Sequence, residues 1–137
     1  MRKDKSEQGW KQKSLESLEN NKWPDQKEYL TGLIKRCHEY RKIPLNQLTV
    51  GQLRTLIAQK IGLKYLMPIA IEFLSVDILI EGDFYSGDLL ESIVKIEQSF
   101  WQQNIALEQE LVDLINSNIE KISNLELSFS NLKGINA

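Results

Sequence analysis

The sequence contains few of the residues from which catalytic and metal sites are usually built. Among 137 residues there is one cysteine, Cys37, and one histidine, His38. A structural zinc site needs several Cys or His ligands, and a disulfide needs two cysteines. Neighbouring residues on a helix point about 100° apart, so Cys37 and His38 cannot face each other as nucleophile and base. We therefore interpret Cys37 as part of an apolar helix face, and we expect no cofactor and no enzymatic activity.

Long hydrophobic runs are also missing. The most apolar stretch, residues 65–80, carries Glu72 and Asp77 and is shorter than the roughly 20 residues of a membrane-spanning helix. The first eight residues are polar and lack the apolar centre of a secretory signal. Low cysteine content is typical of a reducing compartment. These features predict a cytoplasmic protein without a membrane partner.

The glycines do not form a phosphate-binding loop. Gly82 and Gly87 are flanked by acidic residues, which would repel phosphate. The acidic residues at positions 81, 83 and 88 do not have the spacing of a calcium loop. One alternative is a two-metal hydrolase site that uses the four carboxylates of this stretch: Glu81, Asp83, Asp88 and Glu91.

Apolar residues recur at helical spacing along most of the chain, and no stretch alternates long enough to predict a strand. The spacing predicts an all-α, compact single-domain bundle of five to seven helices. We expect a flexible N-terminus over residues 1–13, a helical domain over 14–122 and a loosely ordered C-terminal tail over 123–137. The longer predicted helices cover residues 26–42, 50–61, 64–80 and 105–122.

Several residues predict where these helices begin and end. Gly62 can take the positive φ that closes the helix over 50–61. Pro68 is compatible with the next helix only within its first turn. That helix, over residues 64–80, is apolar nearly all round and is therefore expected in the middle of the bundle. Two pairs have the spacing of a helix-capping box: Asp25 with Glu28, and Thr49 with Gln52.

Charge is distributed unevenly along the chain. Residues 1–42 hold 11 Lys or Arg and 7 Asp or Glu, whereas residues 43–137 hold 6 and 12. Within residues 65–120, Lys95 is the only base against 11 acids, a net charge of −10. Such a segment is either a solvated acidic surface or a docking face for a basic protein.

The stretch from Glu81 to Ser92 combines two glycines, four carboxylates and the adjacent aromatics Phe84 and Tyr85. An apolar run precedes it and an amphipathic run follows, so it is predicted to be a loop between two helices. Aromatics beside acids are typical of a surface that binds a basic protein. Alternatively, Phe84 or Tyr85 plugs the end of the helical core.

A different class of function would use the basic residues of the N-terminal half. A helical nucleic-acid-binding regulator needs a basic stripe, and it would bind DNA or RNA in a salt-sensitive manner. The alternative interpretation assigns these residues no binding function and places them on a solvated helix face. The residues concerned are Lys35, Arg36, Arg41, Lys42 and Arg54.

Several segments, in this order, resemble the immunity proteins of bacterial contact-dependent growth inhibition (CDI) systems over about residues 14–120. They are Cys37-His38-Glu39, residues 41–45, Leu53-Arg54, residues 61–63, Tyr65-Leu66, Pro68, residues 81–85, residues 87–92 and Phe100-Trp101.

The resemblance implies a small cytoplasmic protein, without enzymatic activity, that binds the C-terminal toxin domain of a cognate exoprotein. Such toxins are often nucleases, which are basic where they hold phosphate, so an acidic partner could cover that surface. We expect a monomer in a one-to-one complex with the toxin, and no direct binding of nucleic acid.

The resemblance does not assign binding residues one by one. From their charge and chemistry, we predict a partner-binding patch with Glu81, Asp83, Tyr85, Asp88 and Glu91. Possible extensions of the patch are Glu72, Asp77 and Glu97. If the loop is instead a scaffold, the partner would meet other acids, such as Glu108, Glu110 and Asp113.

Overall fold

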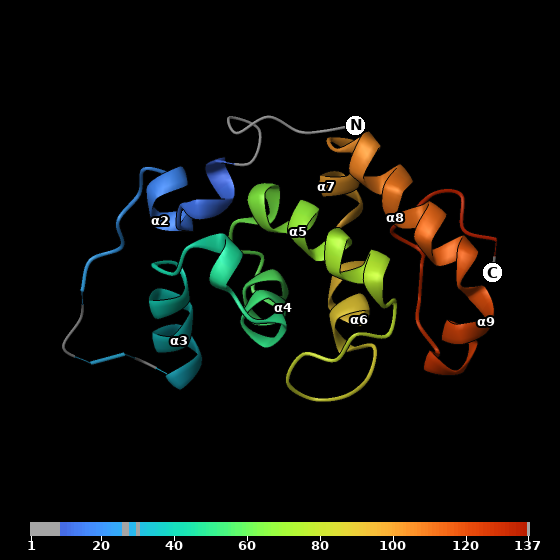
Figure 1. Ribbon diagram of the computed structural model, residues 1–137, viewed down its shortest axis with the longest axis horizontal. Coiled ribbons are helices and arrows are strands. Elements are labelled where there is room, and N and C mark those ends of the chain that lie inside the picture. Colours follow the sequence, from blue (N-terminus) through green and yellow to red (C-terminus); the bar gives the residue numbers. More distant parts are fainter. Residues whose placement is uncertain (1–8, 26–27, 30, 137) are drawn as a thin grey trace.

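The computed structural model describes residues 9–25, 28–29 and 31–136 (Figure 1). Within these residues there are eight α-helices, three 3₁₀ helices and no β-strand, which confirms the predicted all-α fold. Two of the α-helices, α2 and α9, are single turns. The elements are η1 (Trp10–Gln12), α2 (Leu15–Leu18), α3 (Gly32–Tyr40), η2 (Leu45–Gln47), α4 (Val50–Ala58), α5 (Leu63–Val76), α6 (Asp88–Val94), α7 (Gln98–Gln102), α8 (Ile105–Ser117), α9 (Ile119–Ile122) and η3 (Ser123–Leu125).

Helix α5 crosses the middle of the molecule, with α4 and α6 on one side of it and α8 alongside (Figure 1). The predicted central, apolar helix is present, but it ends at Val76 rather than at residue 80, because the backbone is extended at Asp77. Burying each large aliphatic side chain stabilises the fold by about 1.5–3 kcal/mol, so α5 anchors the bundle. Its buried residues are Leu66, Met67, Ile69, Ala70, Ile71 and Leu74.

The helix predicted over residues 26–42 is shorter than expected. Its start is set by Thr31, whose side-chain oxygen accepts a hydrogen bond from the Ile34 N–H at 3.1 Å. Asp25 does not cap the helix, because α3 begins only at Gly32; the Asp25 carboxylate accepts a hydrogen bond from Lys42. Three residues of the predicted first turns lie outside the described part of the chain: Gln26, Lys27 and Leu30.

The start of α4 is as predicted, whereas the position of Pro68 is not. Thr49 and Gln52 form both bonds of a capping box, at 3.1 and 3.0 Å. Pro68 lies at the sixth position of α5, beyond its first turn. Its missing N–H leaves the Lys64 carbonyl without the usual partner four residues on, and Lys64 is exposed so that water can solvate this carbonyl.

Helix α4 is terminated by a motif at Lys60, which the sequence did not predict. Lys60 has φ +60°, and the N–H of Ile61 donates to the carbonyl of Leu56 at 2.9 Å, the pattern of a Schellman motif. Gly62 does have the predicted positive φ, +64°, but it precedes α5 rather than closing α4. There a Cβ would lie 2.6 Å from the buried Leu15 side chain, so glycine permits this close packing.

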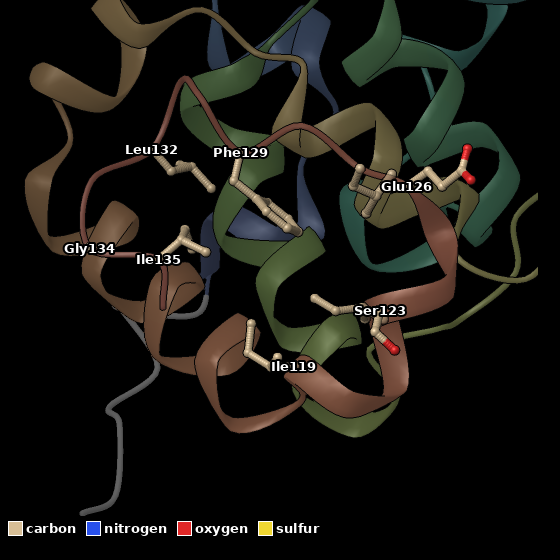
Figure 2. Close-up of a pocket in the computed structure, with 9 residues that line it drawn as sticks. Ile119, Ser123, Glu126, Phe129, Leu132, Gly134 and Ile135 are labelled. Atoms are coloured by element: carbon tan, nitrogen blue, oxygen red, sulfur yellow. The ribbon is translucent and has the colours of Figure 1, made fainter. Parts of the chain in front are cut away.

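The segment after α9 runs back along α8. Leu132 is buried, the Asn116 side chain donates to the Gly134 carbonyl at 2.9 Å, and the Lys133 N–H donates to Glu108. The segment and α9 line an open pocket of about 620 Å³; Figure 2 shows Phe129 and other apolar side chains around it. The domain boundaries proposed from the sequence stay predictions.

Candidate functional site

The segment that joins α5 to α6 contains the acidic loop, defined here as residues 81–87 (yellow in Figure 1). Glu81 and Ser86 form an isolated antiparallel bridge across its base. The Gly87 N–H and the Ser86 hydroxyl both donate to the carbonyl of Leu79, each at 2.9 Å. Gly87 has φ +90°, a left-handed conformation that favours glycine, and it lets the chain turn directly into α6.

Asp88, the first residue of α6, holds the acidic loop from within. Its carboxylate accepts hydrogen bonds from the Gly82 N–H at 2.6 Å and from the Phe84 N–H at 2.9 Å. The residue is only 2 % exposed. Asp88 was predicted to contact a partner, but in the structure it fixes the backbone of the loop.

Arg54 of α4 lies beneath the acidic loop and faces Asp83, Phe84 and Asp88. Its guanidinium carbon lies 4.5 Å from the centroid of the Phe84 ring. Its Nη2 lies 4.0 Å from Asp83 Oδ2, and its Nε lies 3.8 Å from Asp88 Oδ2. One cation therefore offsets two carboxylates and supports an aromatic ring. The sequence offered only one hint of this role, the Leu53-Arg54 pair among the segments that resemble CDI immunity proteins.

The acidic loop approaches α4 closely because residue 51 is glycine. A Cβ at Gly51 would lie 2.0 Å from Asp83 Oδ1, well inside van der Waals contact. No side chain fits between the loop and the first turn of α4. This absence of a side chain lets the Asp83 carboxylate rest against the helix while remaining half exposed.

Both aromatics of the loop face outward. The exposed fraction is 67 % for Phe84 and 44 % for Tyr85, so neither plugs the core. The Tyr85 hydroxyl donates a hydrogen bond to Glu91, which also pairs with Lys95 at 3.3 Å. This hydrogen bond raises the pKa of Tyr85 and lowers the pKa of Glu91, because it favours the neutral phenol and the charged carboxylate. The exposed residues of the acidic loop are therefore Glu81, Asp83, Phe84, Tyr85 and Ser86, with the partly exposed Glu91 of α6 beside them.

The three predicted extensions lie in different surroundings. Glu97 follows α6 and pairs with Lys60 beyond the end of α4. It is separated from the acidic loop by α6, which is about 10 Å long, and by the two residues that follow α6. Glu72 pairs with Lys11 at 2.6 Å, and Asp77 accepts a hydrogen bond from the Leu79 N–H at the start of the connection. Only Asp77 adjoins the loop.

The basic residues proposed for nucleic-acid binding do not form one stripe. Arg41 is 1 % exposed; it donates to Glu19 at 3.0 Å and to the Asn21 carbonyl at 2.7 Å, and it stacks on Trp23. Lys42 pairs with Asp25, and Arg54 lies under the acidic loop. The two remaining bases, Lys35 and Arg36, are exposed on α3.

In residues 9–25, 28–29 and 31–136, no group of three or more His, Cys, Asp or Glu side chains is arranged to hold a metal ion. No helix in this part of the chain is long and apolar enough to cross a membrane.

Comparison with known protein families gives a match. The family model described as CDI immunity proteins matches residues 17–111, which is more than half of the chain and includes the acidic loop, Arg54 and Gly51. The chain therefore belongs to the family of CDI immunity proteins. No curated protein and no solved structure matches it.

Proposed function

We propose that this protein binds the C-terminal toxin domain of a cognate CDI exoprotein and neutralises it in the cytoplasm, without catalysis, in a one-to-one complex. The family match supports a toxin as the partner. The observation that supports the acidic loop as the contact surface is the exposed Phe84, held on Arg54 and surrounded by acidic residues.

The geometry of Phe84 suits a binding anchor. Large aromatic side chains dominate many protein interfaces because each buries about 150–250 Å². Asp88 and Arg54 already fix the loop backbone and the ring, so little conformational entropy would be lost when the ring enters a pocket. Tyr85, restrained by Glu91, would add a second ordered aromatic beside it.

The charge of the surrounding surface supports a basic toxin. Residues 65–120 carry a net charge of −10, and Glu81 and Asp83 are exposed beside Phe84. A nuclease is basic where it holds phosphate, so we infer that the toxin is a nuclease and that the acidic loop covers its substrate surface. Opposite charges would also accelerate association, which matters once a toxin has entered the cell.

The proposal is tested with the toxin domain of an exoprotein encoded beside this gene. The dissociation constant is measured for the wild-type chain and for Phe84→Ala. We expect the dissociation constant of Phe84→Ala to rise about 30-fold, the effect of losing roughly 2 kcal/mol at a hot spot. The matched control is Ile105→Ala, because Ile105 is an apolar residue with almost the same exposure, 68 %.

The possible failures point to different errors. If the wild-type chain neither binds the toxin nor protects cells from it, the proposed function is wrong. If the wild type binds and Phe84→Ala binds equally well, the function stands and the acidic loop is not the contact surface.

A further inference from the structure

A second surface lies between the two long helices α5 and α8. We call it the α5–α8 groove. It has a volume of about 390 Å³, and its lining is mostly apolar. Ile71 of α5 and Leu114 of α8 belong to its apolar floor, and the rim carries three carboxylates: Glu72, Glu110 and Asp113.

The groove is lined by no basic side chain among the described residues. Glu72 pairs with Lys11, but neither Glu110 nor Asp113 has a salt bridge within the described part of the chain. Asp113 accepts one hydrogen bond from the neutral Gln109 side chain. The rim therefore presents two carboxylates whose charge no described residue offsets through a salt bridge.

The ends of the two helices add to this negative potential. Ser75 and Ser117 line the groove one residue before the end of α5 and at the end of α8. A helix C-terminus carries a partial negative charge, which a basic residue in the last turn usually offsets. Neither of these two described helices has a basic residue in its last turn. Two helix ends and three acids thus surround one apolar floor.

The α5–α8 groove adjoins the segment that carries the acidic loop. Ser75 lines the groove, and the next residue, Val76, is the most exposed large hydrophobic residue of the described chain, at 85 %. The connection to the acidic loop begins at Asp77. The C-terminal tail leaves this side of α8 open, because the tail contacts Glu108 and Asn116 instead.

We propose that the α5–α8 groove binds a basic, amphipathic helix of the same toxin, so that the toxin contacts both sides of the end of α5. This inference rests on the proposed function. An apolar side chain of the toxin helix packs on Leu114, while Lys or Arg residues on either side of it face Glu110 and Asp113. These two acids are three residues apart on α8, a rise of about 4.5 Å, and so match bases one helical turn apart.

The first measurement compares the toxin affinity of two charge-reversed variants. The groove variant combines Glu110→Lys with Asp113→Lys. The control variant combines Glu39→Lys with Glu120→Lys, which changes the net charge by the same amount at exposed positions on α3 and α9. The groove variant is expected to bind at least about tenfold more weakly than the control variant, with a smaller dependence of the dissociation constant on salt. Circular dichroism verifies that both variants are folded.

A second measurement does not depend on changing the charge. The native Cys37 is buried, so a cysteine introduced at an exposed position can be labelled selectively with a maleimide. Bound toxin should slow the labelling of Ser117→Cys strongly and that of Ser17→Cys, on the exposed face of α2, very little.

The outcomes separate the two proposals. If the wild type binds toxin but Ser117→Cys is labelled as fast in the saturated complex as in the free chain, the groove proposal is wrong and the proposed function stands. Equal affinities of the groove and control variants would also overturn it. If the wild type does not bind toxin, both proposals fail together.

Discussion

The guanidinium of Arg54 supports the ring of Phe84, with 4.5 Å between the guanidinium carbon and the ring centroid. The two residues are far apart in sequence and come from α4 and the acidic loop. The same guanidinium faces Asp83 and Asp88, and its buried Nε has no hydrogen-bond partner within the described residues. Arg54 therefore holds the loop by stacking and by charge rather than by short hydrogen bonds.

Replacing Arg54 tests how much this contact stabilises the fold. Arg54→Ala removes the cation that faces the buried Asp88, so the free energy of unfolding should fall by about 1–3 kcal/mol in urea titrations. Arg54→Lys keeps the charge but loses the planar group that stacks on Phe84, and it should recover only part of the loss. Arg36→Ala, at an exposed arginine on α3, serves as the control and should change stability by less than about 0.5 kcal/mol. An Arg54→Ala variant as stable as this control would show that Arg54 does not hold the loop.

Gly51→Ala should strain the contact between α4 and the acidic loop. Alanine is intrinsically better than glycine in a helix by about 1 kcal/mol, but the new Cβ would displace the Asp83 carboxylate. The stabilising effect of alanine in the helix should therefore appear in full only when Asp83 is also replaced by alanine. We expect Gly51→Ala with Asp83→Ala to be more stable than the two single changes predict, by about 0.5–1 kcal/mol in a double-mutant cycle. Additive effects within about 0.3 kcal/mol would mean that the two residues do not interact.

The hydrogen bond between Tyr85 and Glu91 predicts a pH-dependent contribution to stability. The folded state lowers the pKa of Glu91, so this contribution is present above the pKa of Glu91 in the unfolded chain and is lost as pH falls through the folded value. The folded state also raises the pKa of Tyr85. At high pH the contribution is therefore lost as pH rises through the folded pKa of the phenol.

Tyr85→Phe removes this hydrogen bond and isolates its effect. At pH 7 the variant should be less stable than the wild type by at most about 1 kcal/mol, because both groups are partly solvated. The difference should vanish in strongly acidic solution, where Glu91 is protonated. Urea titrations between pH 3 and pH 8 measure it. A difference that is the same at both ends of this range would exclude the charged hydrogen bond as its cause.

Short-range patterns in the sequence determined the helices. The spacing of apolar residues predicts the all-α fold and the central position of α5, and Thr49 with Gln52 predicts the start of α4. These features depend on residues within one or two turns of each other. The sequence also predicts that the stretch from Glu81 to Ser92 is a loop between two helices, because glycines and acids interrupt two apolar runs. In the structure the loop is shorter, because α6 already begins at Asp88.

Only the tertiary structure decided which acidic residues are available to a partner. Asp88 reads like its neighbours in the sequence, yet it is buried, because its two oxygens face the backbone N–H groups of Gly82 and Phe84. Arg54 reads like a surface base, yet the packing of α4 against α6 places it under Phe84. Composition and spacing carry no information on contacts between distant segments. Such contacts depend on how the helices pack. In this protein they decide which acids fix the loop and which acids face solvent.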